Sequence, residues 1–193
     1  MSANAHRVFE NSSAVGSFHS EITVSDGQAE ALRQAREEVR SCLREGLRSW
    51  DTLVEKAQLF DDAFRTVDAP ALRPKFRMQG SFSYRTQVAP AHLPPQEIDL
   101  DDGMFLPVSF LQGGGRIKPA IASRGLFLAV ERALMPLCQK RGWNLVTNKP
   151  SCVRVEISET AHVDVALYAI PDAQFAQLVE NAAVKSAAAG TAD

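Results

Sequence analysis

Two aspartates spaced two residues apart carry the chemistry that stands out most in the sequence. Asp99 and Asp101 alternate with the apolar residues Ile98 and Leu100. Because successive side chains of a strand point to opposite faces, this pattern predicts a strand that presents both carboxylates on one face. Neighbouring carboxylates repel each other unless a cation neutralises them, and hard divalent cations prefer oxygen ligands. The pair therefore predicts a metal site; the alternative is a pair of solvated acids at a strand end.

A glycine-serine pair precedes this acidic strand. Gly80 has no Cβ, so the backbone there can approach a phosphate closely. Ser81 can donate its hydroxyl and its backbone N–H to a phosphate, and a helix that begins there would add its N-terminal dipole. Gly-Ser is a common turn, so only the acidic strand that follows makes it a candidate phosphate-binding turn.

A later strand-like segment contributes a third acid, Asp164, which lies between two valines that are expected to face the core. Metal-assisted nucleotidyl transfer needs such a set, because two Mg²⁺ ions about 3.5–4 Å apart bridge the attacking hydroxyl, the transferring phosphate and the leaving pyrophosphate. Asp99 and Asp101 would hold both ions. Asp164 would complete the shell of the ion nearest the attacking hydroxyl and favour its deprotonation.

Two further polar residues near these acids are predicted to stay outside the metal site. Asp102 points away from its two neighbours and precedes Gly103, which predicts a loop residue. His162 shares a face with Asp164, but Mg²⁺ prefers oxygen, so His162 is predicted to pack or to orient a ligand rather than to bind metal.

The elements that must position these residues follow from the apolar periodicity of the chain. Ser25 or Asp26 is a plausible N-cap for a long first helix, and Pro119 suits the first position of a later one. Pro136 is expected to kink or split the last turn of that later helix, and the proline-rich residues 88–96 are predicted to form a loop. The predicted helices cover residues 28–49, 51–66, 118–141 and 171–184, and the predicted strands cover 75–79, 97–110, 144–147, 152–158 and 162–168.

Composition limits the class of protein. A chain of 193 residues with 45% hydrophobic and 23% charged residues is typical of one globular domain. The net charge of −2 argues against broad nucleic-acid binding, and no apolar run is long enough for a membrane span. The first 20 residues lack the layout of a signal peptide, and three cysteines without metal-ligand spacing indicate reduced thiols. We therefore expect a cytoplasmic protein.

Longer strings around these residues resemble a known family. The sequence resembles the nucleotidyltransferase core of the polymerase β superfamily and, more closely, the bacterial cGAS/DncV-like nucleotidyltransferases (CD-NTases), in the branch that contains the bacterial cyclic GMP-AMP synthase. The likeness covers roughly residues 23–175. The strings that carry it are residues 79–86 (QGSFSYRT), 94–103 (PPQEIDLDDG), 148–154 (NKPSCVR), 162–165 (HVDV) and 167–171 (LYAIP).

The resemblance implies an α/β (α+β) fold with a polymerase β-like core, in which a mixed central sheet is flanked by helices and preceded by long N-terminal helices. It implies an N-terminal arm at residues 1–22, a nucleotidyltransferase catalytic lobe at residues 23–184 and a frayed tail at residues 185–193. The C-terminal helical lobe of the family is absent from this sequence, so the expected unit is the catalytic lobe alone.

The resemblance also implies roles for individual residues. The catalytic, metal-binding acids would be Asp99, Asp101 and Asp164, holding two Mg²⁺ ions or Mn²⁺ in their place. The nucleotide-binding residues would be Gln79, Gly80, Ser81, Tyr84 and Arg154, with Gln79 and Ser81 on the donor triphosphate and Tyr84 near a base. Two alternatives stay open: Tyr84 as a half-buried aromatic on a helix, and Arg154 as a strand charge paired with Glu156 or Glu159.

The activity implied is the synthesis of a cyclic dinucleotide from ATP and GTP, with 3′,3′-cyclic GMP-AMP as the product and pyrophosphate released, in anti-phage (CBASS) signalling. Partners would be CBASS accessory proteins or a missing C-terminal lobe. Two alternatives are a nucleotide- or partner-binding module with little catalysis, and a nucleotidyltransferase that forms a linear product on a protein, an RNA or an antibiotic.

Overall fold

The structure is a computed structural model of the chain, and it describes residues 22–53, 71–91, 96–111, 119–147 and 149–178. The predicted arm, apart from residue 22, and the predicted tail lie outside the described residues. The predicted helix of residues 51–66 is described only at its beginning, in α4 (Trp50–Leu53). The last predicted helix is described and helical over residues 172–178.

A single five-stranded sheet forms the centre of the described part, with the strand order β1-β2-β5-β4-β3. β2 and β5 run parallel to each other, and every other neighbouring pair is antiparallel. The sheet is therefore mixed, as the family resemblance implies. The strands are β1 (Lys75–Met78), β2 (Ile98–Pro107), β3 (Asn144–Val146), β4 (Cys152–Ser158) and β5 (Ala161–Ile170).

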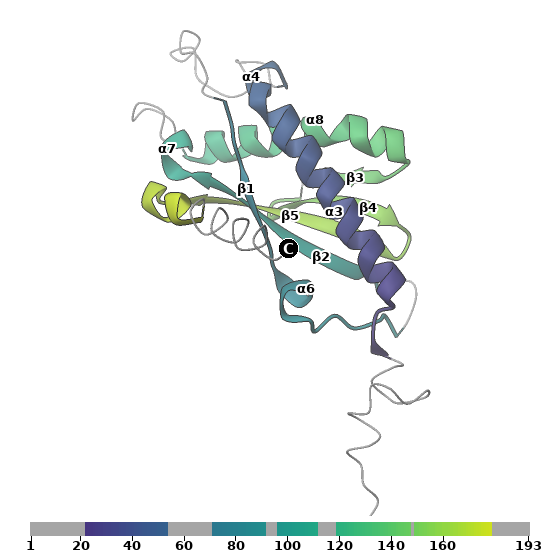
Figure 1. Cartoon of the computed structure of the whole chain (residues 1–193). Coiled ribbons are helices and arrows are strands. Elements are labelled where there is room, and N and C mark those ends of the chain that lie inside the picture. Colours follow the sequence, from purple (N-terminus) through teal and green to yellow (C-terminus); the bar gives the residue numbers. More distant parts are fainter. Residues whose placement is uncertain (1–21, 54–70, 92–95, 112–118, 148, 179–193) are drawn as a thin grey trace, which may run out of the picture.

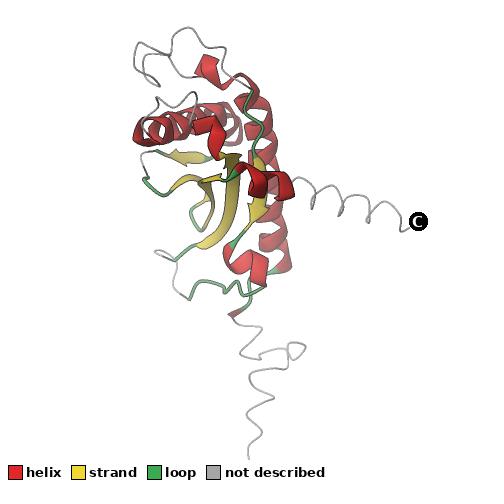
Figure 2. Cartoon of the chain, turned by 90° about the vertical axis from the view of Figure 1, so that its left-hand side faces the viewer, coloured by secondary structure: helices red, strands yellow, loops and turns green. Residues whose placement is uncertain are grey.

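Two long helices, α3 (Asp26–Gly46) and α8 (Pro119–Arg141), pack against each other and against one face of the sheet (Figure 1). Figure 2 shows the strands as one curved layer with helices packed along it. The side chains between the layers form one core, because alternate residues of β2 and β5 face the helices. The fully buried core residues include Leu43, Leu47, Leu100, Met104, Leu106, Leu134, Val153 and Val165.

The first helix begins where the sequence predicts. Ser25 accepts a hydrogen bond from the backbone N–H of Gln28 at 3.3 Å, and the Gln28 side chain accepts one from the backbone N–H of Ser25. This reciprocal capping box satisfies two of the N–H groups that a helix start leaves unpaired. From there α3 buries Ala29, Leu32 and Ala35 among other small and aliphatic residues at helical spacing. It ends in a short 3₁₀ turn, η1 (Leu47–Ser49).

The second long helix decides between the two alternatives expected at Pro136, a kink or a split. The split is wrong, because α8 continues through Pro136 to Arg141. Leu134 and Cys138, on either side of the proline, are both buried, and this packing offsets the backbone hydrogen bond that proline removes. Two short helices complete the described part: α6 (Gly80–Tyr84) and α7 (Val108–Leu111). Among the described helices, none combines the length and the apolar character needed to cross a lipid bilayer.

Candidate active site

The acidic strand presents its two spaced aspartates on the face that turns away from α3 and α8. Along β2, Asp99 is exposed and Asp101 is half-buried, whereas Ile98 and Leu100 are buried in the core. In the parallel pairing of β2 with β5, Asp101 lies directly opposite Asp164. The structure thus brings the three predicted acids together on one open face; their catalytic role stays a prediction.

The electrostatics at Asp101 reflect this crowding. Burial raises the pKa of Asp101 first, and the neighbouring charges of Asp99 and Asp164 raise it further. The charge of Arg154 and the proximity of His162 oppose these effects and lower the pKa of Asp101, but not enough to cancel them. A bound cation would relieve the repulsion among these carboxylates and favour their ionised forms.

Asp164 already has cationic partners. Arg154 lies opposite Asp164 on β4 and donates two hydrogen bonds to its carboxylate, from Nε to Oδ1 at 2.7 Å and from Nη2 to Oδ2 at 2.9 Å. Lys149 lies 3.4 Å from Oδ2. Burial by itself would raise the pKa of Asp164, but the hydrogen bonds and charge of Arg154 hold it below its ordinary value. The alternative that Arg154 pairs with Glu156 or Glu159 is wrong, because the register of β4 and β5 places Arg154 across from Asp164.

The donor atoms of this site suit magnesium. Three carboxylates offer only oxygen ligands, which Mg²⁺ prefers. Across the described part of the chain, however, no three His, Cys, Asp or Glu side chains stand in a ready-made metal-binding arrangement. The guanidinium of Arg154 donates one hydrogen bond to each oxygen of Asp164. A metal bound by all three acids would therefore compete with Arg154 for this carboxylate.

The Gly-Ser turn lies directly against the acidic strand. The backbone N–H of Gln79 donates to the carbonyl of Asp101 at 2.9 Å, and Gly80 then begins α6, a short helix that is not among the predicted helices. Gly80 has a positive φ of 59°, and a Cβ at this position would collide with the Asp101 carboxylate. Glycine is therefore required here both by the backbone conformation and by the close approach of the acid.

Gln79 is held by residues that the sequence argument did not identify. The Tyr168 hydroxyl donates to Gln79 Oε1 at 3.2 Å, and the Tyr168 ring stacks on Phe105 with centroids 5.0 Å apart. The Gln79 side chain also lies over Gly103, where a Cβ would come within 3.0 Å of its amide. Alternation along β2 and β5 could have found these positions, because Gly103, Phe105 and Tyr168 share a face with the acids.

Two other predicted residues are placed as follows. Ser81 is half-buried in the first turn of α6. Tyr84, at the end of α6, is 78% exposed, so the alternative of a half-buried aromatic is wrong. The helix ends immediately after it because Arg85 adopts a left-handed conformation with φ 58°. Tyr84 is therefore free to contact a ligand, and its place near a base stays a prediction.

The two residues predicted to lie outside the metal site are both buried. The loop assignment of Asp102 is wrong: it lies within β2, pairs with Met78 on β1, and is 0% exposed. Arg40 of α3 neutralises it, which is why an aspartate can be buried there. His162 is 5% exposed and its Nδ1 lies 2.6 Å from Glu97 Oε2, so its predicted packing role is confirmed.

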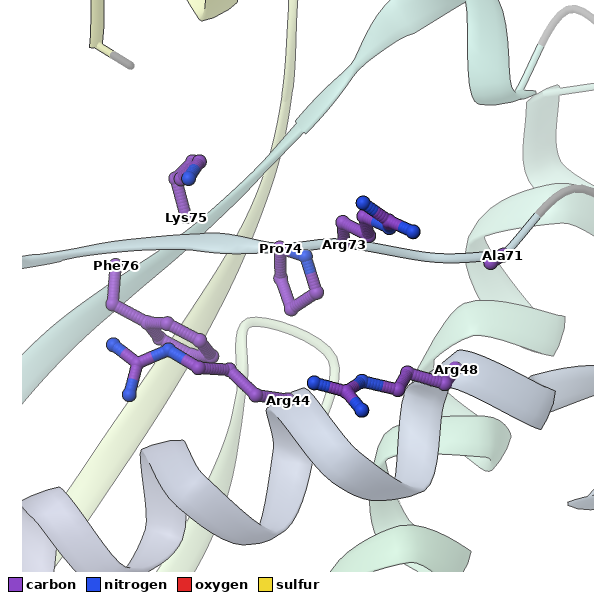
Figure 3. Close-up of a pocket in the computed structure, with 7 residues that line it drawn as sticks. All are labelled: Arg44, Arg48, Ala71, Arg73, Pro74, Lys75 and Phe76. Atoms are coloured by element: carbon purple, nitrogen blue, oxygen red, sulfur yellow. The ribbon is translucent and has the colours of Figure 1, made fainter. Parts of the chain in front are cut away.

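A separate basic pocket of about 560 Å³ lies where α3 and η1 meet the segment leading into β1 (Figure 3). None of the predicted catalytic or nucleotide-binding residues lines it. Phe76 lies at one end, and the Arg44 guanidinium sits over its ring at 5.1 Å. The residues that line the pocket are Arg44, Arg48, Ala71, Arg73, Pro74, Lys75 and Phe76.

A mixed sheet with two acids on one strand, a third on its parallel neighbour and a glycine turn beside them defines the polymerase β-like nucleotidyltransferase fold. Solved structures agree. The Vibrio cholerae di-nucleotide cyclase (DncV), solved as a mutant in complex with ATP, GTP and 5MTHFGLU2, matches with a TM-score of 0.71 and 25% identity, covering 96% of this chain and 55% of that one. The same cyclase with GTP and 5MTHFGLU2 matches with a TM-score of 0.72 and 24% identity, over 96% and 54%.

Sequence comparison identifies the family. Residues 74–168, about half of the chain, match the nucleotidyltransferase-domain model described as cyclic GMP-AMP synthase DncV-like. The chain is 39% identical over 105 residues to a cyclic GMP-AMP synthase of Escherichia coli, and 38% identical over 106 residues to that of Vibrio cholerae. These matches cover 53% and 54% of this chain, and the chain spans only 23% of each of these relatives.

Proposed function

We propose that the chain is the catalytic lobe of a nucleotidyltransferase that joins ATP and GTP into a cyclic dinucleotide. The observation that carries the proposal is the meeting of Asp99, Asp101 and Asp164 on one open face, directly beside the Gly80 turn. The proposed product is 3′,3′-cyclic GMP-AMP, serving anti-phage CBASS signalling, in keeping with the names of the matched relatives.

Each residue has a place in the proposed reaction. Asp99, Asp101 and Asp164 would bind two Mg²⁺ ions, or Mn²⁺ in their place. When bound, such ions stabilise the charge on the transferring phosphate and make the attacking hydroxyl easier to deprotonate. Asp164, once freed from Arg154, would help to orient that hydroxyl.

The turn beside the acids would hold the donor. Gly80 lets the turn lie directly against the Asp101 carboxylate. Ser81, next to it, offers a hydroxyl to the triphosphate. Gln79, oriented by Tyr168, would donate its amide N–H to the same group. Tyr84 is exposed enough to stack on a base, and Arg154 would become available to a phosphate when Asp164 turns to the metal.

The test is turnover of ATP plus GTP by the 193-residue chain with Mg²⁺, followed by pyrophosphate release and mass spectrometry of the product. We expect a cyclic dinucleotide, and no product from the Asp99→Asn/Asp101→Asn variant. Undiminished product formation in that variant would overturn the metal site. A linear or macromolecule-linked adenylate would overturn the cyclase and favour transfer to another acceptor.

A second proposal is favoured by one observation: the chain spans about half of the solved cyclase. It would then act as a nucleotide- or partner-binding module and depend on another polypeptide, such as a C-terminal lobe or a CBASS accessory protein, for efficient turnover. Calorimetry with a non-hydrolysable ATP analogue separates the two. Metal-dependent binding without turnover supports the module, and turnover by the chain alone contradicts it.

A further inference from the structure

The acidic strand contains a buried ion pair that the proposed reaction does not use. Asp102 is 0% exposed on the core face of β2, between Leu100 and Met104, which are equally buried. Arg40 of α3 reaches it with two hydrogen bonds, from Nε to Oδ2 at 2.7 Å and from Nη2 to Oδ1 at 2.6 Å. This is a bidentate arginine–carboxylate pair, the strongest geometry available to these two groups.

Such a pair is a costly way to fill a core. The free energy of removing two charges from water is often larger than the free energy gained from their attraction. Apolar residues of similar size commonly stabilise a core as well or better. Buried ion pairs are instead best attested as devices that select one arrangement over another. The question is therefore which competing arrangement of β2 the Arg40–Asp102 pair excludes.

The competing arrangement is local. Asp101 and Asp102 are adjacent, so one must face the open side and the other the core. A slip of the whole strand is opposed by the four apolar residues of the buried face. A β-bulge at Asp101, Asp102 and Gly103 would not meet that resistance, because a bulge reorients only a few side chains and often contains glycine. It would turn Asp102 to water and Asp101 away from Asp164.

We propose that Arg40 is a positioning residue for the catalytic acids: by holding Asp102 inside the core, it keeps the adjacent Asp101 on the open face opposite Asp164. The expected effect on metal binding rests on the proposed metal site. The orientation of Asp101 and Asp102 on β2 does not depend on a metal.

Arg40 is itself firmly placed. Its side chain is 12% exposed, and Glu37 one turn earlier on α3 contacts Nη1 at 3.1 Å. The guanidinium lies 5.7 Å from the centre of the Phe76 ring on β1. Burial alone would lower the pKa of Arg40, but the hydrogen bonds and charge of Asp102 raise it above its ordinary value. The pair thus ties α3 to the middle of the catalytic strand.

Mn²⁺ binding to the 193-residue chain, measured by calorimetry well below every unfolding midpoint, tests the positioning role. We expect Arg40→Met and Asp102→Asn to bind Mn²⁺ at least about tenfold more weakly, the size typical of losing a group that orients metal ligands. Adding Asp102→Leu to Arg40→Met removes the competing acid, so this double variant should recover Mn²⁺ binding. If Arg40→Met by itself fails to fold, the double variant still tests the proposal, because it leaves no unpaired charge in the core.

Two controls separate positioning from stability. Leu134→Ala removes a fully buried core side chain on α8 and should destabilise the fold while leaving Mn²⁺ binding unchanged. Arg141→Ala breaks a solvent-exposed pair with Glu38 on the same helix as Arg40 and should also leave it unchanged. If Arg40→Met and Asp102→Asn bind Mn²⁺ as tightly as Leu134→Ala, the pair is only structural and the inference is overturned.

Hydrogen exchange distinguishes this failure from failure of the proposed function. Amides of residues 99–103 should exchange faster in Arg40→Met than in Leu134→Ala, whether or not metal is present. If the unsubstituted chain binds no Mn²⁺ but this difference is seen, the metal site fails and the positioning of β2 stands. If the exchange rates are equal, the positioning role fails whatever the metal result.

Discussion

The two faces of the central sheet each carry an arginine–aspartate pair, and the pairs differ in surroundings and consequence. Arg40 and Asp102 are 12% and 0% exposed between sheet and helices, whereas Arg154 and Asp164 are 26% and 14% exposed on the open face. The first pair is enclosed by apolar side chains. The second stands beside two more carboxylates, and burial together with the charges of Asp99 and Asp164 raises the pKa of Asp101. Burial makes the first pair a fixed element of the fold, and we propose that the crowding of acids makes the second exchangeable for a metal.

The largest expected effect is on the open face. Asp101→Asn removes a carboxylate from the centre of the three acids, and we expect pyrophosphate release to fall on the order of 10³-fold, as for loss of a group that stabilises transition-state charge. The metal-free fold should become slightly more stable, by about 0.5 kcal/mol, because a cross-strand repulsion is lost. Initial rates and thermal unfolding measure both. A variant that is less stable and still active would contradict this account.

On the buried face, the expected effect is on stability. Arg40→Leu leaves Asp102 as an uncompensated buried charge and should lower the free energy of unfolding by about 3–5 kcal/mol. Arg154→Leu, on the open face, should lower it by only about 1 kcal/mol, because water screens the exposed part of that pair. Urea unfolding of the two variants compares them directly. Equal losses would show that the two faces do not differ as described.

The pH dependence of stability should separate the two aspartates of the open face. The pKa of Asp164 is lowered in the folded state, so its pairing stabilises the fold above the unfolded-state pKa of about 3.9 and this contribution disappears as the pH falls through the folded-state pKa. Arg154→Gln should therefore be less stable than the parent at pH 7, and the difference should vanish in acid.

The pH dependence of stability due to Asp101 has the opposite sign. Its folded-state pKa is raised, so ionisation costs stability above that pKa, and the cost is absent below the unfolded-state value of about 3.9. Asp101→Asn should thus be more stable than the parent at pH 7 and equal to it in acid. Unfolding midpoints measured from about pH 2 to pH 8 check both signs, and a parallel pH response of the two variants would contradict the assignment.

The smallest expected effect is at Gln79. Tyr168→Phe removes one hydrogen bond to the Gln79 side chain and keeps the ring that stacks on Phe105. The loss of about 1 kcal/mol should raise the KM for nucleotide by roughly fivefold with kcat kept. Steady-state kinetics decides this, and a fall in kcat at constant KM would place Tyr168 in the chemical step instead.

The sequence predicts most of the elements because they are local. The Ser25 cap, the alternation of Asp99 and Asp101 and the glycine turn each depend on residues close in the chain, and each is found. Continuation of α8 through Pro136 was not predictable from the proline alone, because it depends on burial against other elements. Asp102 shows the same limit: Arg40, its partner, lies on a different element, and spacing within β2 does not reveal it.

The partner of Arg154 was missed for a related reason. Glu156 is close to it in sequence, whereas Asp164 is adjacent only once β4 and β5 pair in the observed register. Tyr168 and Phe105 likewise meet through the parallel pairing of β2 and β5, which a reading of each strand by itself does not supply.

Crystallography of the chain soaked with Mn²⁺ and a non-hydrolysable ATP analogue, with anomalous scattering recorded for manganese, tests the central claim most directly. The account predicts anomalous peaks among the carboxylates of Asp99, Asp101 and Asp164, with Asp164 turned from Arg154 toward the metal. A bound nucleotide analogue with no manganese at these acids, and with Asp164 still bound by Arg154, would contradict the account.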